Sequence, residues 1–291
     1  MSTEILALVL YGKSLSIGLL LFIVLALPTI IYFALKKLSR LEPNYRGDRI
    51  PGIFGLYLII ASCVLLNEWH KSQPQLRNAA EYAAWWIAVL GFGLLGLVDD
   101  LIGDKSIKGL RGHISAAVKN HILTSGLFKA IGGMVLAVSL AVIVFHRQNP
   151  VIAAPAAIVI ALSANAFNLL DLRPGRSSAV FLLVSAVLLL HLSMSHAAFR
   201  GEALLCCVVL PAAVTWVIDS RAMAMMGDTG SNVLGASIGL AITLTYSLWV
   251  ILVTLALLIF LHVVAEKHSI TEIISRNQIL NRLDRLTGVR Q

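Results

Sequence analysis

Apolar runs of about 20 residues recur along almost the whole chain, and they constrain its fold more than any other feature. A run of this length, wound as an α-helix, spans the hydrocarbon core of a bilayer and satisfies its own backbone polar groups there. The chain is 58% hydrophobic and 13% charged, whereas soluble domains carry about 25% charged residues. The sequence therefore predicts an all-α, polytopic helical membrane protein, and no polar stretch is long enough for a large soluble domain.

The apolar runs predict about nine transmembrane helices in a single integral-membrane domain covering residues 1–291. The predicted spans are roughly 14–36, 51–67, 82–98, 126–145, 151–170, 178–195, 200–218, 231–246 and 248–265. No charged region followed by a cleavage site begins the chain, so we expect no removed signal peptide. Cys63, Cys206 and Cys207 lie inside apolar segments, which favours small buried side chains over a disulfide or metal framework.

The loops between these spans alternate between basic-rich and basic-poor. Segments 36–50, 99–125, 170–177, 219–230 and 266–291 hold 17 of the 23 Lys and Arg residues. By the positive-inside rule these segments are cytoplasmic, with the N-terminus outside and the C-terminus inside. The net charge of +8 therefore indicates topology and contact with anionic lipid rather than nucleic acid.

Two of the basic segments also carry apolar residues at helical spacing. The first covers 104–122, and the second is a C-terminal tail at about 267–291. Their apolar residues are Ile107, Leu110, Ile114, Val118 and Ile122 in the first, and Ile270, Ile273, Ile274, Ile279, Leu280, Leu283 and Leu286 in the tail. We expect both segments to form amphipathic helices on the cytoplasmic membrane surface.

Charged residues stand at the cytoplasmic ends of several spans. Asp99 and Asp100 close the third span, and Lys129 lies near the start of the fourth, ahead of two glycines. Asp228 precedes the eighth span within the stretch Met-Gly-Asp-Thr-Gly-Ser-Asn. Charged residues at helix ends commonly reach out to the interface, so any one of these alone is compatible with a purely structural role.

Asn165, Asn168 and Asp171 end the fifth span at i, i+3 and i+6, which places them on one side of a helix. Topology thus brings four carboxylates, two carboxamides and a lysine to one face. Adjacent aspartates such as Asp99 and Asp100 repel each other unless a cation neutralises them. Carboxylate and amide oxygens suit Mg²⁺, with Mn²⁺ as an alternative, and Mg²⁺ usually keeps positions open for phosphate oxygens.

This arrangement resembles the polyprenyl-phosphate N-acetylhexosamine-1-phosphate transferases, the group that includes phospho-N-acetylmuramoyl-pentapeptide transferase. The resemblance covers about 45–265. Its specific parts are Tyr-Arg-Gly-Asp-Arg-Ile-Pro at 45–51, Gly-Leu-Val-Asp-Asp at 96–100, Asn-Ala-Phe-Asn-Leu-Leu-Asp at 165–171 and Met-Gly-Asp-Thr-Gly-Ser at 226–231. It implies a bacterial plasma-membrane enzyme that transfers a phospho-sugar from a UDP-sugar to polyprenyl phosphate and releases UMP. A homodimer stays open as an alternative to a monomer.

The resemblance also implies roles for individual residues. Asp228 would be a Mg²⁺ ligand, and Asp99 and Asp100 would hold the lipid phosphate or assist its deprotonation. Lys129 would lie near the phosphates, and its sequence context favours it over Lys119 for that role. Whether Asp99 acts as a base or only positions the acceptor stays open.

The fifth span and the loop after it would contact the nucleotide or sugar through Asn165, Asn168 and Asp171. Here the chain departs from the family, which usually has a second acidic residue where this sequence reads Leu-Arg-Pro-Gly. Arg173 and Arg176 stand nearby instead. They would either bind an additional acidic group on the substrate or simply follow the positive-inside rule.

Two further departures concern the donor site. Met225 stands where the best-known members place an aromatic residue that stacks on uracil, and a tenth span is absent. The family's His-rich cytoplasmic motif is also missing, which leaves His268 as the one candidate histidine after the ninth span. These differences leave the phosphate chemistry in place and predict an altered donor specificity.

Two other functions compete with this interpretation. A non-catalytic descendant would bind lipid phosphate as a scaffold, but retention of all four carboxylates disfavours it. An anion transporter would carry polar groups near mid-membrane and interrupted helices in paired halves. Here the polar groups gather at one face and no internal repeat is visible, so the transporter ranks last.

Overall fold

The computed structural model describes residues 17–38, 41–44, 46–72, 79–103, 125–145, 150–195 and 202–289. Of these described residues, 85% are helical. Its elements in chain order are α2 (Ile17–Leu21), η1 (Phe22–Ala26), α3 (Leu27–Lys37), β1 (Leu41–Pro43), β2 (Arg49–Pro51), α4 (Gly55–Ser72), α5 (Ala79–Trp86), η3 (Ile87–Gly91), α6 (Phe92–Ile102), α8 (Ser125–Phe145), α9 (Pro150–Leu170), α10 (Arg176–Ser195), α11 (Glu202–Asp219), α12 (Gly227–Thr245), α13 (Leu248–Lys267), α14 (Ile270–Arg276) and α15 (Gln278–Thr287).

Five helical stretches in the described part of the chain are long and apolar enough to cross a membrane. They are Ile17–Lys37, Ala79–Ile102, Ser125–Phe145, Pro150–Leu170 and Leu248–Lys267, and two shorter apolar stretches cover Arg176–His191 and Leu204–Asp219. These helices agree with an all-α membrane protein. Every predicted span coincides with a helix, but the count of nine membrane crossings is not confirmed.

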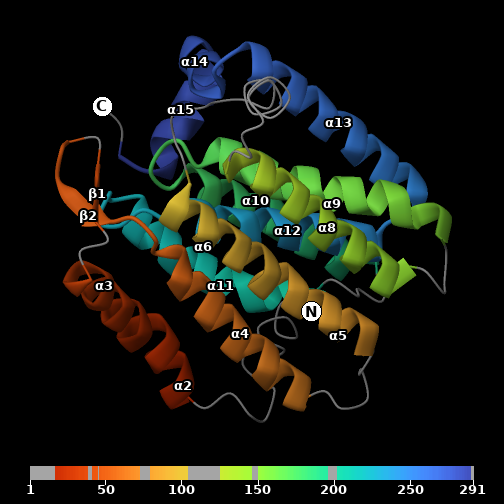
Figure 1. Ribbon diagram of the computed structural model, residues 1–291, viewed down its shortest axis with the longest axis horizontal. Helices are drawn as coiled ribbons and strands as arrows, with labels where there is room; N and C mark the ends of the chain where they lie inside the picture. Colours follow the sequence, from red (N-terminus) through yellow and green to blue (C-terminus); the bar gives the residue numbers. More distant parts are fainter. Residues whose placement is uncertain are drawn as a thin grey trace.

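Helix α12 is apolar only in part because it lies inside the bundle rather than against lipid. It packs against α9, α6, α4, α11 and α10 (Figure 1), and nearly all its residues from Thr229 to Leu244 are buried. Small side chains allow this close packing. A Cβ atom on Gly235 would lie 2.2 Å from the carbonyl oxygen of Ser163 on α9. The central helix of the bundle is therefore the one that carries Asp228 in its first turn.

A short β-hairpin joins α3 to α4. It was not predicted from the sequence. Strands β1 and β2 are antiparallel, with Leu41 opposite Pro51 and Pro43 opposite Arg49. The Asn44 side chain closes the turn by accepting hydrogen bonds from the N–H groups of Arg46 and Asp48, at 2.8 and 2.9 Å. The hairpin lies at the same end of the bundle as α15 and the C-terminus (Figure 1).

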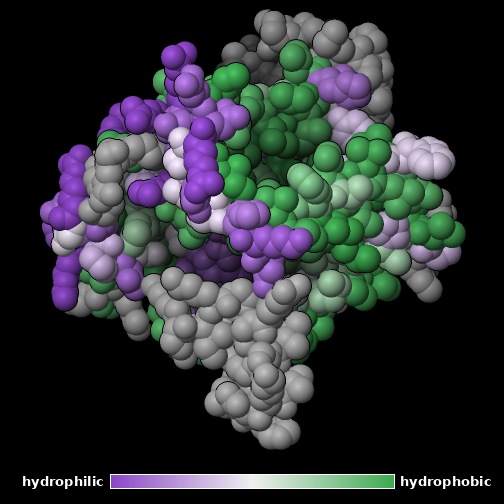
Figure 2. Space-filling view, turned by 90° about the horizontal axis from the view of Figure 1, so that it is seen from above, coloured by the Kyte–Doolittle hydropathy of each residue, from purple (hydrophilic) through white to green (hydrophobic). Residues whose placement is uncertain are grey.

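Hydrophilic residues gather at this end of the molecule, and hydrophobic residues cover much of the remaining described surface (Figure 2). Helix α13 has a single buried residue, Ile251, and exposes Trp249 and Phe260. Such a surface fits contact with lipid. The tail predicted from 267–291 folds as the two short helices α14 and α15, whereas the predicted amphipathic helix at 104–122 lies outside the described residues.

Candidate active site

A carboxylate from another helix holds the first turn of α12. Asp100, near the end of α6, accepts hydrogen bonds from the Asp228 N–H at 3.0 Å and from the N–H and hydroxyl of Thr229 at 2.8 and 2.6 Å. The first N–H groups of a helix need such acceptors, and Met226, at the N-cap position of α12, supplies none. Asp100 therefore caps α12 across the helix–helix interface and fixes the backbone of Asp228.

Two glycines allow α6 and α12 to come this close. A Cβ atom on Gly96 would lie 2.1 Å from the carbonyl oxygen of Asp228, and one on Gly227 would lie 2.6 Å from the Asp100 carboxylate. Gly227 also has φ of +72°, a conformation that side chains other than glycine rarely adopt. The glycines of both motifs thus serve to position Asp228.

The loop before α12 is hydrogen-bonded to the chain that follows β2. The Met225 N–H donates to the Pro51 carbonyl at 2.7 Å, and the N–H groups of Phe54 and Gly55 donate to the carbonyls of Met225 and Met226 at 3.0 and 2.9 Å. These bonds bring the end of the 45–51 motif against the Asp228 loop. Tyr45 itself lies outside the described residues.

Lys129, on α8, lies between two carboxylates. Its ammonium group pairs with Asp228 Oδ2 and lies 3.3 Å from Asp99 Oδ2. The Asn168 side-chain amide donates to the same Asp228 oxygen at 3.2 Å. Helices α6, α8, α9 and α12 therefore each contribute one residue to a compact charged cluster, and the Lys129 side chain is only 14% exposed within it.

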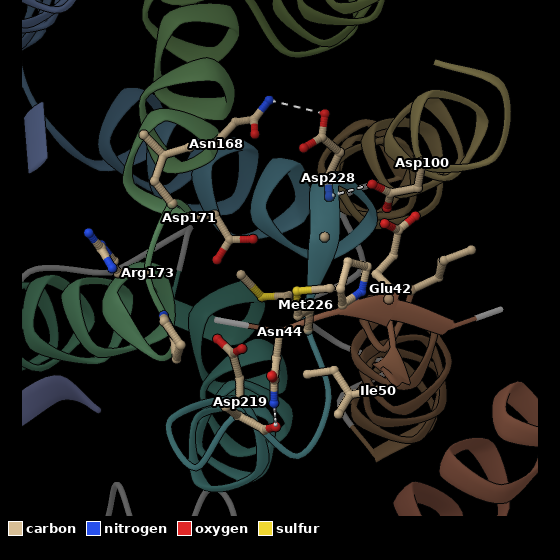
Figure 3. Close-up of a pocket in the computed structure, with 18 residues that line it drawn as sticks. Glu42, Asn44, Ile50, Asp100, Asn168, Asp171, Arg173, Asp219, Met226 and Asp228 are labelled. Atoms are coloured by element: carbon tan, nitrogen blue, oxygen red, sulfur yellow. Dashed lines mark hydrogen bonds between the residues drawn. The ribbon is translucent and has the colours of Figure 1, made fainter. Parts of the chain in front are cut away.

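A cavity of about 320 Å³ opens beside this cluster. Among the described residues that line it are the carboxylates of Glu42, Asp100, Asp171, Asp219 and Asp228 and the cationic side chain of Arg173. Figure 3 shows the aspartates arranged around the space, with Met226 between them. An acidic cavity next to a lysine favours ligands that bring a cation with them, such as a metal-bound diphosphate.

Asp171 has the most perturbed environment among the groups outside the helices. Burial raises its pKa well above the usual value for Asp, and the nearby carboxylates of Asp219, Asp228 and Asp100 raise it further. Lys129 opposes this shift but does not cancel it. In the absence of an added cation, the folded protein therefore holds a proton on Asp171 above the pH at which a free Asp ionises.

The structure brings together seven of the ten residues predicted for the site. They are Asp99, Asp100, Lys129, Asn168, Asp171, Arg173 and Asp228. The functional assignment of each stays a prediction. Asp100 differs from Asp99 in that α12 occupies both of its oxygens.

The structure does not bring the other three predicted residues to the cavity lining, and their predicted roles stay untested. Asn165 is exposed and does not line the cavity, although it shares a helix with Asn168. His268 is exposed at the end of α13. Arg176 is 3% exposed and forms a two-point ion pair with Asp284 of α15, so its guanidinium is not directed at a substrate.

Asp219, Glu42 and Asn44 line the cavity but were not predicted from the sequence. Asp219 is 3% exposed at the end of α11, and its carboxylate accepts a hydrogen bond from the Gly175 N–H at 2.8 Å. Asp219 could have been predicted from its position at the predicted cytoplasmic end of a span, a position that it shares with Asp99 and Asp171. Glu42 and Asn44 had no comparable signal because the β-hairpin was not foreseen.

A divalent cation fits the chemistry of this cluster. No three His, Cys, Asp or Glu side chains within the described ranges are grouped so that they could hold a metal ion together. Asp99 and Asp228 nevertheless already accommodate one positive charge, the Lys129 ammonium, between them. Their carboxylates and the amide of Asn168 are hard oxygen donors of the kind that Mg²⁺ prefers, with substrate phosphate completing the set.

Comparison with known protein families identifies a match over more than half of the chain. The family described as Glycosyl transferase family 4 matches residues 82–247. The matched segment contains all seven residues that the structure brings together, from Asp99 on α6 to Asp228 on α12.

Proposed function

Because this chain belongs to glycosyl transferase family 4, the polyprenyl-phosphate sugar-1-phosphate transferases, we propose that it transfers a phospho-(amino)sugar from a UDP-sugar to undecaprenyl phosphate. UMP is released, and the lipid-linked product enters bacterial cell-envelope polysaccharide synthesis. The observation that carries this proposal is the Lys129 ammonium held between Asp99 and Asp228 beside an acidic cavity. A lysine and carboxylates in this arrangement suit a metal-bound diphosphate and a second, attacking phosphate.

Anion binding in this site depends on side chains rather than on the helix terminus. The N-terminus of a helix commonly binds phosphate through its free N–H groups. In α12 two of these groups, on Asp228 and Thr229, are taken by Asp100. We therefore assign contact with the phosphates to Lys129 on the cluster side and Arg173 on the cavity side.

The reaction needs one phosphorus–oxygen bond to form and one to break. An oxygen of the lipid phosphate attacks the sugar-bearing phosphorus of the UDP-sugar, and the bond from that phosphorus to the bridging oxygen breaks, so that UMP leaves. The lipid phosphate is already ionised at neutral pH, so no strong base is required. Asp99 then serves to orient Lys129 and the acceptor, because its carboxylate is 3.3 Å from the ammonium group.

Mg²⁺ is the cofactor that we propose, with Asp228 and Asp99 as its protein ligands. When bound, it supplies Lewis-acid stabilisation of the charge that develops on the diphosphate oxygens. Asn168 donates to Asp228 Oδ2 and so holds this carboxylate in place. Lys129 neutralises the same pair of carboxylates in the absence of the ion and is available for the phosphates in its presence.

The described part of the cavity lining offers polar groups to a donor, and no aromatic side chain is among its residues. Met225 and Ile50 supply apolar contacts, while Glu42, Asn44 and Asp219 offer oxygen acceptors for hydroxyl or amide groups. We propose that these side chains set the donor specificity in which this chain differs from better-known relatives.

A direct test uses the purified protein in nanodiscs with Mg²⁺, undecaprenyl phosphate and a panel of UDP-sugars, and measures UMP release. We expect one or a few donors to release UMP, and a mass spectrum of the lipid product identifies the sugar. Lys129→Gln and Asp228→Asn should lower kcat by about a hundredfold or more, because both remove charge stabilisation of the transition state. Glu68→Gln, which breaks the Lys71–Glu68 ion pair far along α4, is the matched control and should retain full activity. Absence of UMP with every donor would overturn the proposal.

A further inference from the structure

The C-terminal tail is attached to one wall of the cavity. The segment from Asp171 to Gly175 connects α9 to α10, and its first four residues line the cavity. The tail helices α14 and α15 follow α13, and α15 ends against this same segment. Figure 1 shows α15 and the C-terminus at the end of the bundle where α9 passes into α10.

The strongest contact is a buried ion pair. Arg176, the first residue of α10, binds Asp284 of α15 through Nε at 2.6 Å and through a terminal nitrogen at 3.1 Å. Its other terminal nitrogen donates to the Thr271 hydroxyl of α14 at 3.2 Å. The side chains of Arg176 and Asp284 are 3% and 9% exposed. A buried two-point pair fixes orientation far better than an exposed one, so both tail helices are held in one position relative to α10.

Further hydrogen bonds, each accepted by a backbone carbonyl, link the end of α15 to α11 and the residue that follows it. The Trp216 indole N–H donates to the Thr287 carbonyl at 2.8 Å, and the Val289 N–H donates to the Ser220 carbonyl at 2.8 Å. Gly175 has φ of +74°, and a Cβ atom there would lie 2.2 Å from the Thr287 carbonyl oxygen. The end of α15 therefore touches the backbone of the cavity wall directly.

Asp219 of α11 holds the same residue of this wall, Gly175. Its carboxylate accepts the Gly175 N–H at 2.8 Å, and it lines the cavity as well. Gly175 is thus fixed between α11 and α15. Any displacement of the tail would shift Gly175, and with it Arg173 and Asp171, because only two to four residues separate them.

From these contacts we propose that α14 and α15 brace the donor side of the active site. Arg176 and Asp284 are positioning residues in this proposal: neither touches substrate, and they hold the wall that carries Asp171 and Arg173. The proposal rests on the proposed function, which assigns this wall to the nucleotide-sugar. It also explains why Arg176 is present although it does not face the cavity.

The first test compares Asp284→Asn with Glu272→Gln in full-length protein. Glu272 forms an exposed pair with Arg276 in the same tail, at 2.5 Å and 54% and 78% exposed, so it controls for charge removal as such. With the most active UDP-sugar of the panel, Asp284→Asn should raise the donor KM by about tenfold, because a displacement of about 1 Å in a binding group has effects of this order or larger. The KM for undecaprenyl phosphate should change less than twofold, and Asp284→Glu should restore part of the donor affinity. Glu272→Gln should change neither KM.

Equal KM values for Asp284→Asn and Glu272→Gln would overturn the brace while leaving the proposed function intact. If Asp284→Asn does not yield folded protein, Trp216→Phe tests the same junction, since it removes the hydrogen bond to Thr287 and keeps an aromatic ring of smaller size. It should raise the donor KM in the same direction by a smaller factor, and an unchanged donor KM contradicts the proposal.

Hydrogen exchange provides a readout that needs no activity. The amides of Gly175 and Asp171 should exchange faster in Asp284→Asn, or in Trp216→Phe, than in Glu272→Gln and the unmodified protein. Unchanged exchange at these amides would overturn the brace even if no donor were found. If instead exchange changes as expected and no UDP-sugar gives UMP, the brace stands and the proposed function fails.

Discussion

Asp99 and Asp100 are adjacent in the sequence, but the structure gives them different surroundings. Asp100 is committed to the first turn of α12 by three hydrogen bonds. Asp99 instead lies 3.3 Å from the Lys129 ammonium group, and it is the carboxylate of the two that we propose as a Mg²⁺ ligand. From sequence alone the two residues were equivalent, because nothing in a pair of neighbouring aspartates shows which one meets the end of another helix.

We therefore predict opposite results for the two Asp→Asn substitutions. Asp100→Asn should destabilise the protein by about 1–2 kcal/mol, as expected for a damaged helix cap, and lower Tm by roughly 2–4 °C. Asp99→Asn should leave Tm unchanged within about 1 °C, because Lys129 keeps its ion pair with Asp228, and should reduce kcat strongly. Thermal unfolding and UMP release on the same two preparations measure both quantities. A drop in Tm for Asp99→Asn as large as that for Asp100→Asn would contradict this division of roles.

The raised pKa of Asp171 makes a prediction about stability and pH. The folded protein holds a proton on Asp171 at pH values where the unfolded chain, with a pKa of about 3.9, has lost it. The stabilising contribution of Asp171 is therefore complete at pH values below its pKa in the unfolded chain. This contribution is lost as the pH rises through its higher pKa in the folded protein.

In a chelator and at constant scan rate, Tm of the unmodified protein should fall from pH 5 toward pH 8. Asp171→Asn cannot ionise, so its Tm should exceed that of the unmodified protein at pH 8 and show a smaller slope. The same substitution should lower activity, as is common where charged groups are held together for function. If Tm depends on pH in the same way in both proteins, the raised pKa of Asp171 does not contribute to stability as predicted.

At the scale of elements, the sequence predicted the helices well and their packing poorly. The nine apolar runs all became helices because membrane-spanning length and hydrophobicity are local properties of a segment. The β-hairpin was missed because its three-residue strands are too short to show any periodicity. The tail was predicted as a lipid-bound surface helix from the spacing of Ile279, Leu283 and Leu286, which are indeed exposed. Its attachment to Arg176 could not be predicted, since an ion pair across 108 residues leaves no local pattern.

The close contact of α6 with α12 requires a glycine at position 96 on α6, and this can be tested with a matched pair of substitutions. Gly96→Ala would place a methyl group 2.1 Å from the Asp228 carbonyl oxygen, which forces the two helices apart. Gly133→Ala, on α8, would meet its nearest atom, on the Leu95 side chain, at 3.7 Å, an ordinary contact distance. Both changes raise helix propensity by about the same amount, roughly 1 kcal/mol.

Gly96→Ala should therefore lose activity by about a hundredfold or fail to fold, since it displaces Asp228 by more than 1 Å. Gly133→Ala should keep activity within about twofold and raise Tm slightly. The measurements are UMP release and thermal unfolding in the same detergent. Full activity in Gly96→Ala would mean that the position of Asp228 against α6 is not required.

At the scale of the whole molecule, every residue of the candidate site lies at the polar end of a bundle whose remaining surface is largely apolar (Figure 2). This arrangement suits the proposed reaction between a water-soluble nucleotide and a lipid, because the acidic cavity adjoins α6, α8 and α9, which belong to helical stretches long and apolar enough to cross a membrane. Four site residues come from separate helices, so no single segment could have revealed the site. The site was predicted because the motifs stand next to basic loops, which the positive-inside rule assigns to one side of the membrane.

The positive-inside rule predicts that this polar end faces the cytoplasm, and that orientation is open to a direct test. A fluorescent protein that folds only in the cytoplasm, fused after Gln291, should fluoresce, because the tail follows the last predicted span on the basic side. Alkaline phosphatase, active only outside the plasma membrane, should be active when inserted within 73–78, between α4 and α5, and inactive when fused after Gln291. The reverse pattern would put Asp228 and Lys129 outside the cell, away from the proposed donor, and would contradict the transferase function and the assigned topology together. With the N-terminus outside, an active phosphatase at 73–78 requires an even number of membrane crossings before that segment. This result therefore tests the first two predicted spans independently of the site.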